Sequence, residues 1–487
     1  MLVINFAAYA PDLHPFDASY SDAIVNVLPT ANGYAPFPQL VAYSNAVGTY
    51  PVVGYFAART TDGTFTSFCA TSGKLYKFNA TSRGWDDVSR TASAYTGTSG
   101  FWCFSQYGNK LIACNLNDAP QVFDITTSTN FEDLAGSPPA ADGVAIVGDF
   151  VFLYGLSGDF GKVHWSGLDD PEFWTPYDNS CDFQIFPDGG RVNFVAPISG
   201  GAYVLQERCI RALTFAPASS AIFTSTKLSS DRGCVSQQCV TQIGDTVFFL
   251  SNDGFYSISG GVVSPIGAEK VDRTFFDNVD HNAIADTIAA NDPFNKVVYW
   301  AGKTSYTSDT YDYILGYDWQ LGRWFKVEAT IEFMASMQTP GYSIDDIPSL
   351  GYTLDTLPWS LDSRILKGGR PAMAAFDTAH KLALFEGDAM EATLETADIA
   401  LTSGARSCIR EFRPVTDASG AYGRIATRAR HQDARTWKSE SAIAASGRCY
   451  TRADGLLHRF RLRIPAGESW TTAIGIGDII KRQAGRK

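Results

Sequence analysis

Long hydrophobic runs are absent from this sequence of 487 residues, and no stretch of about 18 apolar residues occurs that could cross a membrane as a helix. Charged residues make up only 18% of the chain, below the roughly 25% of typical soluble domains. No helical pattern of about 12 or more residues dominates any part, which argues against coiled coils and helical bundles. The opening segment MLVINFAAYAPDLHPFD has no basic residues before its apolar run, so we do not expect a signal peptide.

Sequence motifs that indicate catalysis or cofactor binding are also missing. The chain contains no C-x-x-C, P-loop, H-E-x-x-H, G-x-S-x-G or G-x-G-x-x-G pattern. Its cysteines are odd in number and scattered, and none of the six histidines lies near one in sequence, so we expect reduced, buried thiols in a protein made in a cytoplasm. We therefore expect no metal, no cofactor and no enzymatic activity.

A few titratable groups still require an explanation. Three pairs of adjacent acids occur, but a glycosidase needs two carboxylates that converge at about 5–9.5 Å, and adjacency in sequence does not provide this. His164 lies in a strand pattern that ends at Trp165, where a histidine satisfied within the sheet is a better interpretation than a catalytic base. The acidic pairs are Asp86-Asp87, Asp169-Asp170 and Asp345-Asp346.

Aromatic residues, in contrast, are abundant at 13%, and 43 glycines divide the chain into short segments. This composition favours an all-β fold. From about residue 51, units of about 45–55 residues recur, each with short strands separated by turns such as Asn252-Asp253-Gly254. We predict a β-propeller over 51–396, with six blades or alternatively seven, preceded by a docking segment at 1–50. A Pro/Gly-rich stretch at 339–370 interrupts the pattern and is expected to form an arm.

The charge of −12 is unevenly distributed. Residues 397–487 carry 17 Lys and Arg against 8 Asp and Glu, a net +9, which leaves −21 on residues 1–396. We predict that 397–487 forms a separate, basic, β-rich platform domain.

Within this domain, the segment LHRFRLRI alternates apolar and basic residues, which places three arginines on one face of a strand at Leu457–Ile464. We predict that this face lies in or beside a contact between subunits, because like charges on one face need an acidic surface to oppose them. Contact with phosphates, or a solvated face balanced by neighbouring acids, are the alternatives. The candidate interface residues are Arg459, Arg461 and Arg463, with Arg424, Arg428 and Arg430 from the segment GRIATRARH.

Several blocks of sequence resemble the tail nozzle proteins of short-tailed bacteriophages, also called packaged-DNA stabilisation or tail tube hub proteins. The resemblance covers nearly the whole chain. It is carried, in this order, by NVLPTANGYAPFPQL, WSGLDDPEFWTP, DFQIFPDGGRV, DRGC with GDTVFFLSNDGFYSI, ILGYDWQLGRW, LPWSLDSRILKGGRPAMAAFD and LLHRFRLRIPAGESWTTAIG.

The resemblance implies a structural virion protein of the phage tail, made in the cytoplasm of the host bacterium. Its propeller would form the bulk of a protomer in a homo-hexamer that surrounds a channel for double-stranded DNA, below the portal and its adaptor ring. Tail fibres, spikes or a needle would attach to this ring, which would retain the packaged genome and serve as the conduit for its ejection. Two alternatives remain from the residues themselves: a receptor- or glycan-binding propeller, and a propeller glycosidase.

Overall fold

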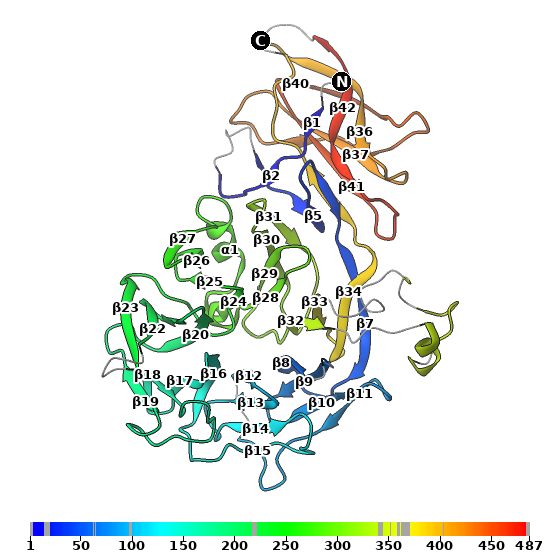
Figure 1. Cartoon of the computed structure of the whole chain (residues 1–487). Coiled ribbons are helices and arrows are strands. Elements are labelled where there is room, and N and C mark those ends of the chain that lie inside the picture. The colour runs from blue at the N-terminus through cyan, green and yellow to red at the C-terminus, as the bar shows by residue number, and fades with distance from the viewer. Residues whose placement is uncertain are drawn as a thin grey trace.

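The computed structural model describes residues 3–13, 20–61, 63, 65–96, 100–216, 222–338, 344–350, 352–357, 361, 371–402 and 404–483. Nearly all regular elements in these ranges are β-strands, and they form a propeller joined to a β-sandwich (Figure 1). The prediction of an all-β propeller with an additional β-rich region near the C-terminus is confirmed.

The first three blades are antiparallel sheets in which each strand pairs with the next one along the chain. Short apolar segments that end at Gly, Asn or Asp turns give this meander, as the sequence pattern predicts. The strands are β8 (Val52–Arg59), β9 (Phe65–Thr71), β10 (Leu75–Asn79) and β11 (Gly84–Asp87); β12 (Cys103–Tyr107), β13 (Lys110–Cys114), β14 (Gln121–Asp124) and β15 (Glu132–Asp133); and β16 (Ala141–Val147), β17 (Phe150–Leu156), β18 (Asp159–Trp165) and β19 (Asp182–Ile185).

The next three blades repeat this arrangement. Their strands are β20 (Val192–Ile198), β21 (Gly201–Gln206), β22 (Ile210–Phe215) and β23 (Phe223–Ser229); β24 (Val240–Ile243), β25 (Thr246–Ser251), β26 (Gly254–Ser259) and β27 (Val262–Pro265); and β28 (Ile288–Asp292), β29 (Val297–Gly302), β30 (Tyr313–Asp318) and β31 (Arg323–Val327). A short helix, α1 (Asp272–Asn278), and a 3₁₀ turn, η1 (His281–Asp286), connect the fifth blade to the sixth.

The seventh blade closes the ring with a strand from the other end of the chain. It contains β32 (Phe333–Gln338), β33 (Pro371–Phe376) and β34 (Lys381–Ala389), and its outer strand is β7 (Pro38–Ala46), which runs beside β34 in Figure 1. The preferred count of six blades is thus corrected to the alternative count of seven. The repeat pattern undercounted because the fourth strand of this blade lies about 340 residues earlier in the sequence, inside the segment expected only to dock.

Of the arm expected at 339–370, the described residues include a 3₁₀ segment, η2 (Ile344–Leu350), and residues 352–357. The Arg83 guanidinium of the first blade donates a hydrogen bond to the Tyr352 hydroxyl at 2.7 Å. The described part of the arm therefore contacts the propeller. The rest of the arm lies outside the described residues.

Two sheets form the sandwich that is drawn above the propeller in Figure 1. One contains β36 (Ser407–Thr416), β40 (Cys449–Gly455) and β42 (Ala473–Gln483); the other contains β35 (Ala392–Glu395), β37 (Tyr422–Arg428), β38 (Thr436–Trp437), β39 (Ser441–Ala442) and β41 (Leu457–Ile464). The rings of Phe412 and Phe460 meet between the sheets with centroids 5.2 Å apart. A side chain at Gly423 would clash with the Phe412 ring, so this close approach requires glycine.

Strands near the N-terminus bind the sandwich to the propeller. β4 (Ile24–Val25) pairs with β31 of the sixth blade on one side and with β35 on the other, so a single twelve-stranded sheet runs from the sixth blade into the sandwich. The remaining short strands near the N-terminus are β1 (Ile4–Asn5), β2 (Ala8–Tyr9), β3 (Tyr20–Ser21), β5 (Val27–Pro29) and β6 (Tyr34–Pro36), of which β1 and β6 pair with β42. The structure thus distributes the N-terminal segment over both bodies and places both chain ends at the sandwich (Figure 1).

No helix among the described residues is long and apolar enough to cross a membrane.

Candidate functional site

The arginine strand β41 is an inner strand of the twelve-stranded sheet, with β35 on one side and β37 on the other. The predicted alternation is present, because Arg459, Arg461 and Arg463 share one face and Phe460 and Leu462 are buried on the other. The arginines differ in exposure, since only 1% of the Arg459 side chain is accessible against 29% and 27% for the other two.

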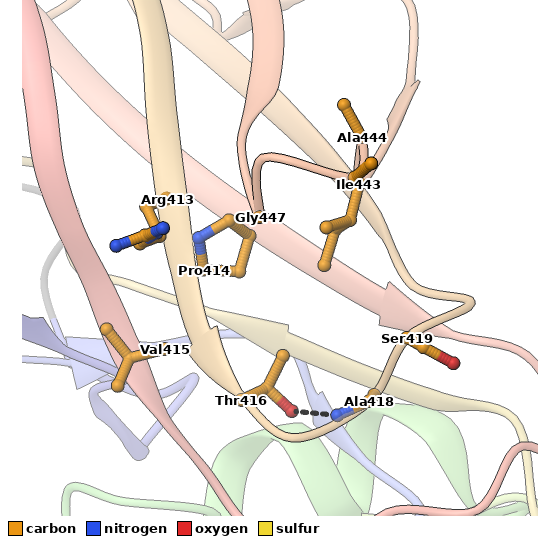
Figure 2. Close-up of a pocket in the computed structure, with 10 residues that line it drawn as sticks. Arg413, Pro414, Val415, Thr416, Ala418, Ser419, Ile443, Ala444 and Gly447 are labelled. Atoms are coloured by element: carbon orange, nitrogen blue, oxygen red, sulfur yellow. Dashed lines mark hydrogen bonds between the residues drawn. The ribbon is translucent and has the colours of Figure 1, made fainter.

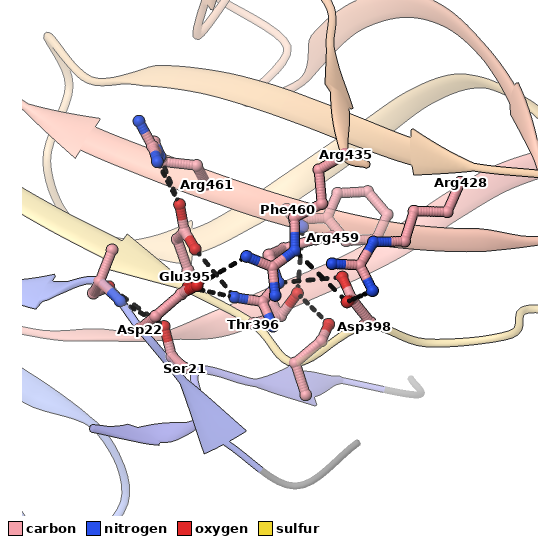
Figure 3. Close-up of polar contacts among 12 residues, drawn as sticks. Ser21, Asp22, Glu395, Thr396, Asp398, Arg428, Arg435, Arg459, Phe460 and Arg461 are labelled. Atoms are coloured by element: carbon pink, nitrogen blue, oxygen red, sulfur yellow. Dashed lines mark hydrogen bonds and ion pairs between the residues drawn. The ribbon is translucent and has the colours of Figure 1, made fainter. Parts of the chain in front are cut away.

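Arg459 lies at the centre of a buried ionic network (Figure 3). Its guanidinium is 2.5 Å from the Asp22 carboxylate, 3.0 Å from that of Asp398 and 3.2 Å from that of Glu395. Arg435 adds contacts at 2.6 Å to Asp22 and 3.4 Å to Asp398. The network therefore joins the N-terminal segment to two strands of the sandwich.

Burial affects Glu395 and Asp22, two of the three carboxyl groups of this network, differently. It raises the pKa of Glu395, and the guanidinium groups of Arg461 and Arg459 only partly oppose that rise. Burial also acts to raise the pKa of Asp22, but Arg459 and Arg435 outweigh it and hold this pKa below its ordinary value. Of these two carboxyl groups, only Asp22 has a pKa that the arginines lower below its ordinary value.

The other two arginines of β41 also have partners within the chain. Arg461 is 2.5 Å from Glu395 and its guanidinium lies over the Trp437 ring at 4.3 Å. Arg463 is 3.1 Å from Glu391 and 3.0 Å from Glu440. Acidic residues of the same chain therefore balance most of the positive charge on this face. This was one of the alternatives that the sequence left open.

The neighbouring strand places the remaining candidates in different surroundings. Arg428 joins the network through Asp398 at 3.2 Å, and Arg424 donates to the Lys438 carbonyl at 2.6 Å. Arg430 is exposed in the turn after β37. The structure thus brings Arg428, Arg459 and Arg461 together.

Burial excludes Arg459 from any contact with another subunit, which corrects its assignment as an interface residue. The prediction missed this because Asp22 is more than 400 residues away in sequence. The spacing of Glu391 and Glu395 was a usable signal, since Glu395 pairs with Arg461 across β35 and β41 and lies on the same face.

A cavity of about 560 Å³ opens in the sandwich between the end of β36 and residues 443–447 (Figure 2). Among the described residues of its lining, Arg413 alone is charged, and its guanidinium donates to the Ser446 carbonyl at 2.9 Å. The remainder of the lining is small or apolar, with Pro414 and Ile443 as its bulkier members. Among the described residues of this lining, the hydroxyls are those of Thr416 and Ser419, and none is a histidine, cysteine or carboxylate that could act as an acid–base group.

His164 and Cys181 form a pair that sequence reasoning missed, with 3.6 Å between the imidazole Nε2 and the thiol Sγ. Burial lowers the pKa of His164 to about 4 and raises that of Cys181 to about 11. Moving the proton from thiol to imidazole would cost about 9–10 kcal/mol at about 1.36 kcal/mol per pKa unit. The thiol also donates to the Trp165 carbonyl at 3.1 Å, so this is a neutral, structural pair.

Metal coordination has no evident place in the described ranges, where no three His, Cys, Asp or Glu side chains converge. All nine cysteines are described and none is in a disulfide; seven are buried and two are partly buried.

No family model matches this sequence, and no curated protein matches it. Among solved structures, the chain is similar to the extracellular domain of a two-component system protein, BT4673, from B. thetaiotaomicron, with 9% identity and a TM-score of 0.43. That match covers 82% of this chain but only 47% of the other, so the chain spans about half the length of that domain. BamB from Moraxella catarrhalis is similar over 79% of this chain and 97% of its own, with 11% identity and a TM-score of 0.37. At these values the similarity concerns the fold alone.

Proposed function

We propose that this β-propeller protein is a structural component of the tail of a short-tailed bacteriophage, a nozzle protomer of which six copies surround a channel for the genome. The proposal rests on the sequence blocks that resemble such proteins. The observation that supports it best is the continuous sheet that connects the propeller to the sandwich. A conduit that holds DNA under pressure needs a protomer whose parts do not move apart.

That connection has two components within the described residues. The twelve-stranded sheet runs without a break from the sixth blade through β4 into the sandwich. The Arg459 network joins the N-terminal segment, through Asp22, to Glu395 and Asp398 of the sandwich, and the Arg459 side chain at its centre is almost fully buried. A sheet that is continuous through both bodies, with its N-terminal strand held to the sandwich by these ion pairs, resists hinge motion better than a flexible linker would.

The charge distribution agrees with passage of DNA. Residues 1–396, which include the propeller, carry −21, and a negatively charged lumen would repel phosphates and let a duplex slide. In this proposal the partners are an adaptor ring above and tail fibres, spikes or a needle at the side or tip. The protein would be located in the tail of the virion and would need no catalytic site or cofactor.

Electron microscopy of particles tests the proposal. A six-fold ring of this chain directly below the portal and adaptor is the expected result, and particles that lack the chain should lose their packaged DNA. If the chain is absent from particles, or is found only at the tip of a fibre, the proposal fails and a receptor-binding role takes its place.

A further inference from the structure

The surface of the third blade combines features that suggest a contact site. The loop of residues 166–181, between β18 and β19, is ordered by hydrogen bonds, among them Trp165 Nε1 to the Ser180 carbonyl at 2.9 Å. The Leu168 amide donates to the Asn179 carbonyl, also at 2.9 Å. This loop is therefore a fixed part of the blade surface.

The loop also holds its backbone in an unfavourable conformation. Tyr177, Asn179 and Ser180 have φ values of 67°, 46° and 61°, in the left-handed region that residues other than glycine seldom adopt. Strain of this kind persists only where the surrounding structure imposes it, and it occurs often at binding surfaces.

The strained loop presents a large aromatic ring to solvent. Tyr177 is 80% exposed, and its ring centroid lies 6.0 Å from that of Phe183 on the outer strand β19. Ile185 on the same strand is 49% exposed and Phe160 on β18 is 40% exposed. Register places Ile185 opposite Lys162 and Phe183 opposite His164, so these apolar groups lie along one face of the outer blade. We call Phe160, Tyr177, Phe183 and Ile185 the blade-3 strip.

Acidic residues outnumber basic ones in the blade that carries this strip. Residues 141–185 contain eight acidic residues against one lysine, a net −7. That lysine, Lys162, lies over the Phe183 ring at 3.7 Å, and Arg191, which pairs with Asp142, lies over the Phe160 ring at 4.5 Å. Within the described part of the chain, Asp159, Asp178 and Asp182 form no ion pair, and Asp178 is exposed. An apolar strip on a blade with a surplus of acids fits a partner that presents apolar side chains between cations.

The outer face of the sandwich sheet has these properties. Tyr450 on β40 and Ile480 on β42 both pair with Glu411 of β36, so they lie on one face on either side of Glu411, and they are 54% and 45% exposed. Arg410 and Arg452 are exposed beside them, and neither forms an ion pair with any described residue. We call Arg410, Tyr450, Arg452 and Ile480 the sandwich patch.

We propose that the blade-3 strip of one copy binds the sandwich patch of a second copy of this chain. The two surfaces are opposite in charge and both carry exposed apolar side chains, and they occur on different parts of the molecule (Figure 1). A contact between two different surfaces is the type that builds rings of more than two subunits. This inference rests on the proposed function in one respect: the proposed ring requires a contact between subunits, and the inference identifies the two surfaces that would form it.

A nucleic acid is the less suitable occupant of the sandwich patch. Glu411 lies between Tyr450 and Ile480, and Asp454 and Asp478 lie on the same sheet, so acids interrupt the positive surface. Phosphates would meet these carboxylates, whereas a protein surface with mixed apolar and charged groups would not be repelled in this way.

Sedimentation velocity on the full-length chain at low and high salt tests the proposal. We expect concentration-dependent association of the unaltered protein at low salt, weakened by salt. Tyr177→Ala, Asp178→Lys and Arg452→Glu should each weaken it roughly tenfold or more. The matched controls are Tyr306→Ala, at a tyrosine 57% exposed in another blade, Asp231→Lys and Arg430→Glu, all of which should associate normally.

A mixture of the Asp178→Lys and Arg452→Glu proteins gives the decisive result. Each variant keeps one intact surface, so the mixture should form heterodimers while each variant alone remains monomeric. Circular dichroism of each variant verifies that it is folded, and a variant that fails this check is replaced by Ile185→Ser or Arg410→Glu at the same surface.

Three outcomes would overturn the inference. The first is that the unaltered protein is monomeric at every concentration of protein and salt. The second is that it associates but none of the substitutions weakens the association. The third is that Arg452→Glu associates normally but loses binding to duplex DNA. If particles still form the ring when the chain carries these substitutions, this contact is refuted but the proposed function is not. Heterodimers from a chain that is absent from particles refute the proposed function but not this contact.

Discussion

Replacing Arg459 by methionine should weaken the junction between the N-terminal segment and the sandwich much more than the same change at Arg463. Arg459 is almost fully buried among three carboxylates at 2.5, 3.0 and 3.2 Å. At an effective dielectric constant of about 20, each such pair is worth about 5 kcal/mol before desolvation, which costs several kcal/mol per ion.

The expected loss follows from what the substitution leaves behind. Removing one partner of a buried ion pair typically costs about 3–5 kcal/mol, because the remaining charge stays buried. Asp22 and Asp398 would keep Arg435, and Glu395 would keep Arg461, so we expect the lower end, about 3 kcal/mol. Arg463 and its partners Glu391 and Glu440 are partly exposed, which predicts about 0–1 kcal/mol for Arg463→Met.

Hydrogen exchange is the suitable assay, since a chain of this size need not unfold in a single step. A loss of about 3 kcal/mol corresponds to roughly 100-fold faster exchange of the amides of β4, β35 and β41 if they open together. Combining Arg459→Met with Asp22→Asn should cost less than the sum of the two changes, because the pair is lost once. The reasoning is refuted if Arg459→Met and Arg463→Met change exchange in these strands equally.

Three further predictions concern other parts of the chain. Burial raises the pKa of Asp272 to about 7, so the folded state retains a proton that the unfolded state loses from about pH 4. The free energy of unfolding should therefore fall as the pH rises between these two values. The urea midpoint of the unaltered protein should fall over the same range, and that of Asp272→Asn should not show this fall. Ser44 accepts hydrogen bonds from Trp85 Nε1 at 3.1 Å and the Leu382 amide at 3.0 Å, so Ser44→Ala should lower the free energy of unfolding by about 1–3 kcal/mol. Hydrogen exchange of the Leu382 amide should become faster, while that of the Val204 amide in the fourth blade should not change. With its pKa near 11 and its side chain buried, Cys181 should resist iodoacetamide at neutral pH until the protein unfolds, and labelling of the folded protein there would contradict the neutral pair.

Local patterns predicted much of this fold, because propeller strands pair mostly with their neighbours in sequence. The segments that became β8 to β11 and β20 to β23 are recognisable from alternation and turn residues alone. β7 was not recognisable as a blade strand, since its partner β34 is about 340 residues away and no local signal specifies that pairing. Contacts of this kind depend on the complete topology.

In the candidate site, too, local features could be predicted from the sequence and contacts with distant segments could not. Alternation correctly placed Arg459, Arg461 and Arg463 on one face of a strand. Whether that face meets solvent, another subunit or its own chain depends on β35 and the N-terminal segment, which cover it with Glu395 and Asp22. The sign of the charge could be predicted from sequence, but its burial could not.

The closure of the seventh blade by β7 has a consequence for biosynthesis. The ribosome makes β7 long before β34, and at roughly 5–20 residues per second the interval between Ala46 and Lys381 lasts about 20–70 s. Throughout that time β7 lacks the strand β34 with which it pairs, although its Asn45 amide can donate to the Arg83 carbonyl of the first blade, and β1 and β4 wait even longer for β42 and β35. Pairings so distant in sequence slow folding and expose strand edges to other nascent chains. The first six blades can form in order as they emerge, and the last step, which joins the two ends of the polypeptide, is therefore the one at which a chaperone would be of most use.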